Sequence, residues 1–399
     1  MGTRGIAAAA LAALGLSCGS APQGAVTSCA VTSLVPVPVK TDILFVVDDS
    51  GSMSEEQANL AANLDAFVAT LAASPAKDQF QIGVTTTSVA GTSATDFSAT
   101  ETTYASGPNA AAPVVPYPAG RLVAVDPATG RLRWDPATGA FTGNRILAAG
   151  SPTLVADFKA NVRVGTGGSG KEQGLAAIRL ALTDRIVDGT NAGFLRPGAR
   201  LAVVILSDED DCTETNSPYA LTTNDLCHDP TRKAGGTNGA EPVSDFVALL
   251  QGPIAGERRE IAAAGIIAVD PVTRARDTQC ATAFDKVSRY FDFVEAFGQS
   301  ALVDSICNAS FRQTLEQIAG VIAPQFVELS QVPADPALLT VALHRADGTT
   351  QPCQLGTDPG GTFDAIYSEP EGHPPRITFQ RNCVLHQGDA VDLQLLCAR

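Results

Sequence analysis

The chain has 399 residues, of which 45% are hydrophobic and 17% charged, and its formal net charge is -15. This length and hydrophobic content allow a full hydrophobic core and a second, smaller domain. The negative charge argues against nucleic acids and anionic membrane surfaces as partners, because both repel an acidic protein.

Residues 1–17 resemble a bacterial secretory signal peptide. The apolar run from Ile6 to Leu16 is too short to span a bilayer but has the right size for the apolar region of such a peptide. Residues 14–18, LGLSC, are similar to a lipobox, although Gly15 stands where a Leu-like residue is usual. We expect export and lipidation of Cys18, which would anchor a lipoprotein in the bacterial cell envelope; ordinary signal cleavage is the alternative.

The nine cysteines are consistent with an exported protein. Without a lipidated Cys18 eight remain, and an even number in an exported chain suits a disulfide framework. A bond between Cys212 and Cys227 would close a loop of about 15 residues and stabilise the fold by roughly 3 kcal/mol. The sequence contains no CxxC pair, so it gives no sign of a zinc site or a thioredoxin-type motif.

The first unit of the fold follows a tether that we place at residues 18–40. Ile43 to Val47 is an unbroken apolar run rich in β-branched residues, typical of a strand covered on both faces in a parallel sheet. Directly after it, Asp48, Ser50 and Ser52 place one carboxylate and two hydroxyls on alternate residues. These oxygens can be aimed at a common point.

An amphipathic helix follows this oxygen-rich loop. Ser54 and Gln57 form a capping-box pattern at its start. Its predicted apolar face consists of Leu60, Leu64, Phe67, Val68 and Leu71. The loop therefore lies between a strand and a helix at the carboxyl end of the strand, where open α/β sheets bind ligands.

Residues 48–52, DDSGS, resemble the DxSxS motif of the von Willebrand factor type A domain. In that family the motif forms the metal-ion-dependent adhesion site (MIDAS) shared with integrin inserted domains. The resemblance implies a doubly wound, mostly parallel α/β sheet and a divalent ion held by Asp48, Ser50 and Ser52.

A second strand is predicted at Phe80 to Thr86, after which the regular pattern is lost from residue 87 to 151. Within this stretch, residues 121–125 and 131–134 flank a DPATG turn that predicts a hairpin, and the same turn sequence recurs at 135–139. We interpret residues 87–151 as a surface insertion of the main domain.

Residues 165–171, GTGGSGK, match the first seven positions of a phosphate-binding loop. The eighth position excludes that site, because Glu172 stands where Ser or Thr must hold magnesium, and its carboxylate would repel phosphates. The family resemblance implies instead that Ser169 supplies a hydroxyl to the metal, since it stands five residues before Gly174 where the family has Thr. Thr166 is the fallback ligand.

Leu201 to Leu206 is another apolar strand, and Asp208 lies just beyond it, as the third ligand loop of the family requires. The resemblance thus implies five ligands from three loops: Asp48, Ser50, Ser52, Ser169 and Asp208. Further polar residues nearby are either solvated or form an outer shell or a second calcium site: Asp49, Thr166, Glu209, Asp210 and Asp211.

Two carboxylates and three hydroxyls are hard oxygen ligands, which favour magnesium, with calcium or manganese as alternatives, over zinc or copper. In the family, the open coordination position accepts an acidic side chain of a partner protein. The sequence suggests no Ser-His-Asp arrangement, so we expect adhesion-type binding without catalytic residues. The alternatives are a hydrolase in which the acidic cluster around Asp208 activates water, and a metal that only stabilises the fold.

The remaining elements complete an alternating order of strands and helices. We expect a helix at Ser244 to Leu250, a strand at Glu260 to Val269 and a closing helix at Ser310 to Ile322, with Ser310 and Gln313 as its capping box.

Beyond Pro324 the pattern becomes one of alternating strands, at Leu339 to Leu343, Arg376 to Phe379 and Val391 to Leu395. We expect a small all-β, sandwich-like domain here, stapled by some of Cys353, Cys383 and Cys397. The predicted divisions are a signal peptide at 1–17, a tether at 18–40, the von Willebrand type A domain at 41–324 and the β domain at 325–399.

Lipidation can be tested on the mature N-terminus. Mass spectrometry should find a diacylglyceryl group on Cys18, because the lipobox-like residues precede it. Cleavage at another position, or an intact Met1, would contradict the prediction.

Overall fold

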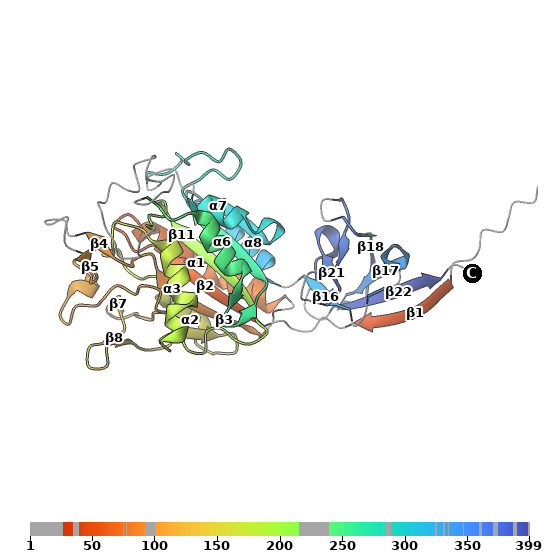
Figure 1. Ribbon diagram of the computed structural model, residues 1–399, viewed down its shortest axis with the longest axis horizontal. Coiled ribbons are helices and arrows are strands. Elements are labelled where there is room, and N and C mark those ends of the chain that lie inside the picture. The colour runs from red at the N-terminus through yellow and green to blue at the C-terminus, as the bar shows by residue number, and fades with distance from the viewer. Residues whose placement is uncertain are drawn as a thin grey trace, which may run out of the picture.

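The computed structural model describes residues 27–34, 40–92, 100–214, 239–281, 283 and 289–397, except positions 75, 77, 324, 330, 331, 334, 346, 359, 360, 370–373 and 386–388. These residues form an α/β body and a smaller β body (Figure 1). Within them, no helix has the length and apolar character needed to cross a membrane. The predicted signal peptide and Cys18 lie outside the described residues.

A six-stranded sheet in the order β10-β3-β2-β11-β14-β15 is the centre of the α/β body. Its strands are β2 (Thr41–Val47), β3 (Phe80–Thr86), β10 (Ile146–Ala148), β11 (Arg200–Ser207), β14 (Ile261–Ile267) and β15 (Ala301–Ser305). All neighbours pair in parallel except β10, which is antiparallel to β3. Every residue of β2, β3 and β11 is buried, so the predicted mostly parallel sheet with doubly covered strands is confirmed.

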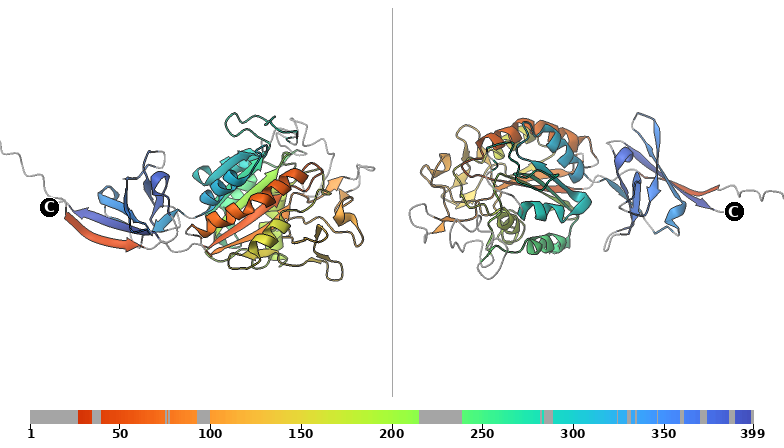
Figure 2. Two further views of the ribbon diagram at one scale, coloured as in Figure 1. Left: turned by 180° about the vertical axis from the view of Figure 1, so that it is seen from behind. Right: turned by 90° about the horizontal axis from the view of Figure 1, so that it is seen from above.

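Helices cover both faces of this sheet. They are α1 (Ser54–Ala72), α2 (Leu154–Asn161), α3 (Gly174–Leu182), α4 (Asp184–Val187), α6 (Val243–Gln251), α7 (Arg289–Glu295) and α8 (Arg312–Ile322). α1 and α8 lie side by side on one face, seen from behind in Figure 2, and α3 and α6 lie on the other. The predicted apolar face of α1 is buried apart from the half-buried Val68, and Phe67 meets Phe45 of β2 edge to face at 5.5 Å.

The two predicted capping boxes are wrong. No side chain caps the start of α1, and the Gln57 amide instead donates to the carbonyl oxygens of Asp48 and Gly165, both at 2.8 Å. α8 begins only at Arg312, again without a side-chain cap from the residue before it. The capping box does not form at α1 because the side-chain amide of Gln57 is already bound to carbonyl oxygens of two loops that the fold brings together.

Residues 87–151 pack on the core more closely than a surface insertion would. Tyr104, Leu122 and Val123 belong to the main hydrophobic cluster, and β10 closes one edge of the main sheet. The first DPATG turn forms the predicted hairpin, and the second, predicted only as a turn, also joins two paired strands. The short elements are β4 (Gly91–Thr92), β5 (Thr100–Glu101), η1 (Pro108–Ala110), β6 (Val125–Asp126), β7 (Arg131–Leu132), β8 (Trp134–Asp135) and β9 (Ala140–Phe141).

The β body consists of two four-stranded sheets, β1-β22-β17-β18 and β16-β21-β20-β19, that share one hydrophobic cluster. Its strands are β1 (Thr27–Leu34), β16 (Phe326–Glu328), β17 (Leu339–His344), β18 (Thr350–Cys353), β19 (Leu355–Gly356), β20 (Ala365–Ser368), β21 (Arg376–Phe379) and β22 (Ala390–Cys397). Short pieces complete the described chain: β12 (Pro253–Ile254), β13 (Glu257–Arg258), η3 (Gly298–Ser300), η4 (Pro336–Leu338) and η5 (Arg381–Cys383).

The edge strand β1 comes from the segment that the sequence predicts to be a tether. It pairs antiparallel with β22 from Thr27 opposite Cys397 to Leu34 opposite Val391, with one irregularity. Figure 1 shows this red strand beside the blue β22. The two ends of the chain therefore build one sheet, and the α/β body is inserted between them.

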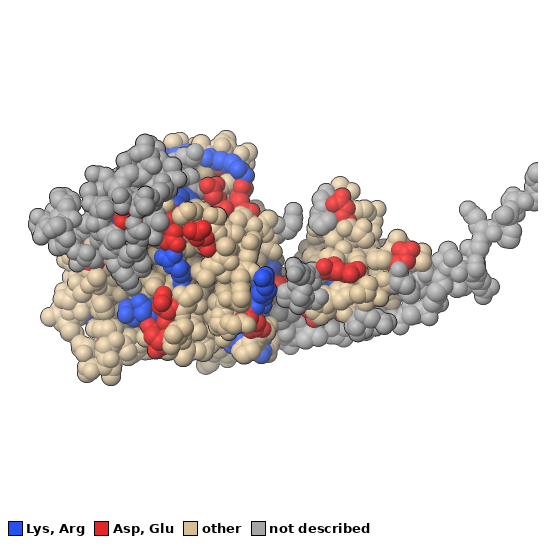
Figure 3. All heavy atoms as spheres, viewed as in Figure 1, with Lys and Arg blue, Asp and Glu red and all other residues tan. Residues whose placement is uncertain are grey.

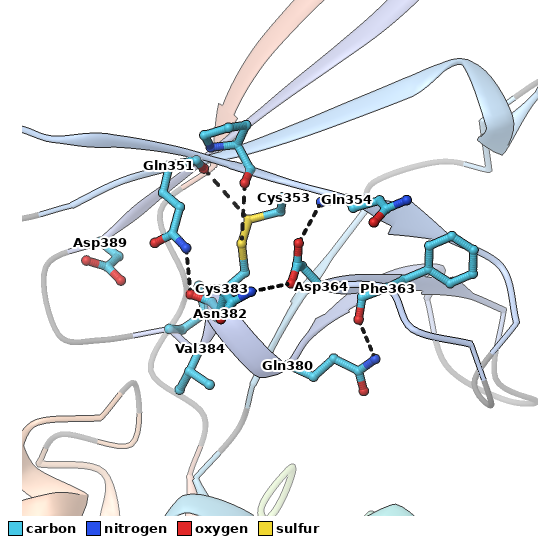
Figure 4. Close-up of a disulfide and its surroundings, with 12 residues drawn as sticks. Gln351, Cys353, Gln354, Phe363, Asp364, Gln380, Asn382, Cys383, Val384 and Asp389 are labelled. Carbon is cyan, nitrogen blue, oxygen red and sulfur yellow. Dashed lines mark hydrogen bonds between the residues drawn. A yellow bond between two sulfur atoms is a disulfide. The ribbon is translucent and has the colours of Figure 1, made fainter.

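Two disulfides lie within the described residues. Cys353 and Cys383 join β18 to η5 in the β body, as Figure 4 shows, which confirms that some of the C-terminal cysteines are bonded to one another. Cys280 and Cys307 form the other. Cys212 is also disulfide-bonded, but Cys227, its predicted partner, lies outside the described residues.

The pairing of β1 can be tested by removing residues before Lys40. Deletion leaves the edge of β22 open, so the β22 backbone amides that point toward β1, which alternate with those that point toward β17, should exchange with deuterium at least about tenfold faster. Amides of β11, in the α/β body, are the internal control and should keep their protection. Unchanged exchange in β22 would show that β1 does not pair there.

Candidate metal centre

The candidate site lies at the carboxyl ends of β2 and β11, which are neighbours in the sheet. The strand order reverses between these two strands, because β2 leads outward to β3 and β11 leads outward to β14. Such a switch point is where open α/β sheets bind ligands. A backbone hydrogen bond of 2.9 Å from Asp48 to the carbonyl of Leu206 joins the two strand ends.

The first loop holds Asp48, Ser50 and Ser52 together. Asp48 is fully buried; its Oδ1 accepts from the backbone N–H of Ser50 at 2.8 Å, and its Oδ2 accepts from the hydroxyl of Ser207 at 2.6 Å. The hydroxyl oxygens of Ser50 and Ser52 are 3.4 Å apart. The structure therefore brings the three oxygen-bearing side chains predicted from this loop into one place.

Asp208 follows β11, as predicted, and is fully buried. Neither of its carboxylate oxygens has a hydrogen-bond partner. Burial raises the pKa of Asp208 to about 7. The nearby hydroxyl of Ser52 opposes this rise, whereas the negative charges of Glu209 and Glu56 add to it. The pKa of Asp48 is raised well above its usual range by burial and then by the charge of Asp208, so the two carboxylates face one another closely enough to interact.

Glu172 is the carboxylate that the sequence reasoning missed. It is fully buried, and both of its carboxylate oxygens lack a hydrogen-bond partner. Its pKa is raised well above the usual range, by burial and then by the charges of Asp48 and Glu209. The signal was present in the sequence, because this is the residue that excludes the phosphate-binding loop.

Ser169, the ligand predicted from the second loop, is engaged elsewhere. Its hydroxyl donates to the carbonyl of Ala90 and accepts from the backbone N–H of Lys171, both at 3.1 Å. The side chain of Lys171 forms a buried ion pair with Glu214. Thr166 is half-buried in the same loop. Glu172, from the same segment, is close enough to Asp48 for the charge of Asp48 to raise its pKa.

Asp49 points away from this cluster. Its carboxylate accepts from the hydroxyls of Ser88 at 2.7 Å and Tyr104 at 2.5 Å. Burial raises its pKa to about 6, with both hydroxyls opposing the rise. Asp49 therefore ties the first loop to residues 87–151.

Asp210 and Asp211 also have structural partners. Asp211 accepts from the guanidinium of Arg289 at 2.9 Å and from the backbone N–H of Leu175, in the first turn of α3, at 2.9 Å. Asp210 accepts from the backbone N–H of Arg289 at 2.9 Å. Of the predicted outer acids, only Glu209 raises the pKa values of the carboxylates at the site.

The donor set fits a divalent ion held by oxygen. Among the residues that the structure describes, no three His, Cys, Asp or Glu side chains are arranged as a metal site, so the hydroxyls of Ser50 and Ser52 would have to complete it. Four buried carboxylate oxygens, two on Asp208 and two on Glu172, have no hydrogen-bond partner. Buried charge of this kind is costly unless a cation or hydrogen bonds offset it.

The site carboxylates differ in burial from the acidic residues on the surface of the α/β body. On the face of the α/β body in Figure 3, acidic and basic side chains lie next to one another. The site acids lie beneath the surface instead, where low dielectric strengthens their repulsion.

No family model matches the chain, and no curated protein matches it. Several solved structures are similar to the chain. The pilus adhesin SpaC of Lactobacillus rhamnosus GG is 11% identical with a TM-score of 0.37, covering 90% of this chain and 39% of that one. Proximal thread matrix protein 1 of the mussel byssus is 12% identical with a TM-score of 0.36, covering 74% and 51%.

Another structure of the mussel protein has a zinc-occupied MIDAS motif. The manganese-loaded TRAP protein of Plasmodium vivax is 10% identical with a TM-score of 0.31, covering 92% of this chain and 96% of that one. The chain spans only 39% of the pilus adhesin and 51% of the mussel protein. At these TM-scores the likenesses carry no conclusion about the site.

Because the pKa of Asp208 is raised in the folded state, we expect the protein without metal to lose folding stability as the pH rises. Below the unfolded pKa of 3.8 the group is protonated in both states, and the cost grows until the pH passes about 7. In chelator, Asp208→Asn should therefore become more stable relative to wild type as pH rises from 4 to 8, by on the order of 2 kcal/mol. Urea unfolding at a series of pH values measures this difference.

Asp65→Asn, an exposed change on α1, is the control and should show no such trend. A constant difference between Asp208→Asn and wild type from acid to alkaline pH would mean that Asp208 is not a buried, strained carboxylate.

Proposed function

We propose that the chain is a von Willebrand factor type A protein whose MIDAS-type site binds a divalent ion and uses it to hold an acidic side chain of a partner protein. The observation that carries this proposal is the group of unpartnered buried oxygens on Asp208 and Glu172 beside Asp48. These groups lie at the carboxyl ends of β2 and β11, between which the strand order reverses, and open α/β sheets bind ligands at such a point.

We propose Asp48, Ser50, Ser52 and Asp208 as the residues that hold the ion, with the buried carboxylate of Glu172 beside them in the second loop, where Ser169 was the predicted ligand. Magnesium suits these hard oxygens, with calcium or manganese as alternatives. When bound, the ion supplies an open coordination position for a carboxylate. The hydrogen bonds from Ser50 and Ser207 hold the Asp48 carboxylate in one orientation before any ion arrives.

We further propose that the protein is exported and held at the cell envelope through Cys18, where it acts in adhesion or assembly. The hydrolase and the purely structural metal remain the competing functions, because both would use the same acids. They differ in what depends on the metal: binding of a partner, turnover of a substrate, or stability alone.

Metal binding should raise the melting temperature of the purified chain. Magnesium or calcium at 100 times the dissociation constant should stabilise it by about 2.7 kcal/mol. Asp208→Ala should abolish the shift, because it removes a carboxylate that lies past the strand end, and Asp65→Ala on the exposed side of α1 should leave it intact. A wild-type protein with no response to either ion would refute the metal site.

The same preparation separates the three functions. Acidic peptides that bind with metal and dissociate on adding chelator would support adhesion. Metal-dependent turnover of ester or phosphate substrates would support the hydrolase. A melting shift without binding or turnover would leave a structural ion.

A further inference from the structure

A cavity of about 480 Å³ lies beside the start of α1, immediately after the loop that carries Ser50 and Ser52. One wall comes from the first turns of α1 and the other from the segment after β15. The residues used below are Glu55, Glu56, Ile306, Ala309 and the disulfide between Cys280 and Cys307.

Glu56 contributes a nearly buried carboxylate to the lining of this cavity. The residue is only 6% exposed, yet its Oε2 atom is buried without a hydrogen-bond partner. Such an oxygen is costly to bury unless a ligand completes its hydrogen bonding. Glu55, beside it on the rim, is exposed and adds a second carboxylate.

The rest of the cavity lining combines apolar and polar groups, which suits a side chain with an aliphatic stem and a polar head. Ile306, Ala309 and the disulfide contribute apolar surface to the lining, and Asn59 and Asn308 contribute amide groups. Lysine and arginine side chains combine an aliphatic stem with a cationic head, and they lie along apolar surface in this way.

Charge balance at the neighbouring metal centre points to the same ligand. A divalent ion offsets the two charges of Asp48 and Asp208, but four further acidic residues remain nearby: Glu55, Glu56, Glu172 and Glu209. Glu56 is close enough to act on Asp208 electrostatically. A partner that offered only a carboxylate would therefore enter a region that is still negative, whereas one that also carries a cation would not.

We infer that the partner of the metal site carries a lysine or arginine close to its acidic residue, and that this basic side chain fills the cavity with its head on Glu56. This inference rests on the proposed function, because it names the chemistry of the ligand for the same site. It predicts recognition of a paired acid and base instead of any exposed acid.

The probes are synthetic peptides with one aspartate and one lysine separated by glycine spacers of increasing length. Matched peptides carry norleucine, which keeps the stem of lysine and lacks its charge. Fluorescence anisotropy in magnesium should show one spacer length at which the lysine peptide binds the wild-type chain roughly tenfold more tightly than its norleucine counterpart.

Two variants test the charge of Glu56 and the open volume of the cavity separately. Glu56→Gln keeps the side-chain shape and should reduce the lysine preference to near unity. Ala309→Phe should remove the preference by filling the exposed mouth of the cavity. Asp65→Asn, on α1 but outside the cavity lining, should keep the preference.

The outcomes distinguish this inference from the proposed function. If no aspartate peptide binds in a metal-dependent way, the proposed function fails and the inference with it. If lysine and norleucine peptides bind equally and in a metal-dependent way, only the inference fails. If Glu56→Gln abolishes the melting shift produced by metal, Glu56 holds the ion, and the inference is again overturned.

Discussion

The cost of burying negative charge at the carboxyl end of the central sheet is the constraint on which the site depends. Asp48, Glu172 and Asp208 are all fully buried, and each is ionised less readily than it would be in water. A protein would avoid such a cluster unless a cation compensated it. The surrounding structure keeps the carboxylates in place despite their repulsion.

Polar contacts from several elements supply that support. Gln57 joins the first loop to the second through two carbonyl oxygens, and Asp49 joins the first loop to residues 87–151 through Ser88 and Tyr104. Arg289 of α7 holds Asp211 behind the third loop. The neighbouring acids are therefore a scaffold for the site more than additional ligands.

The sequence predicted the features that local patterns encode and missed those that depend on distant contacts. The apolar runs of β2, β3 and β11 are readable because strands covered on both faces must be apolar throughout, and Asp208 follows from the end of such a run. The sequence marked Glu172 only as the residue that excludes a phosphate-binding loop, because its proximity to Asp48 comes from the fold. β10 is three residues long, too short for a period to appear.

The pairing of β1 with β22 determines how the molecule would carry load. The chain leaves β1 at Leu34 and enters the α/β body at Thr41, whereas the return path runs from α8 into β16. If the N-terminus is fixed to a membrane and a bound partner pulls on the α/β body, tension runs along the axis of β1. The hydrogen bonds to β22 are then sheared together instead of opened one at a time, and that is the geometry in which a pair of strands resists force best.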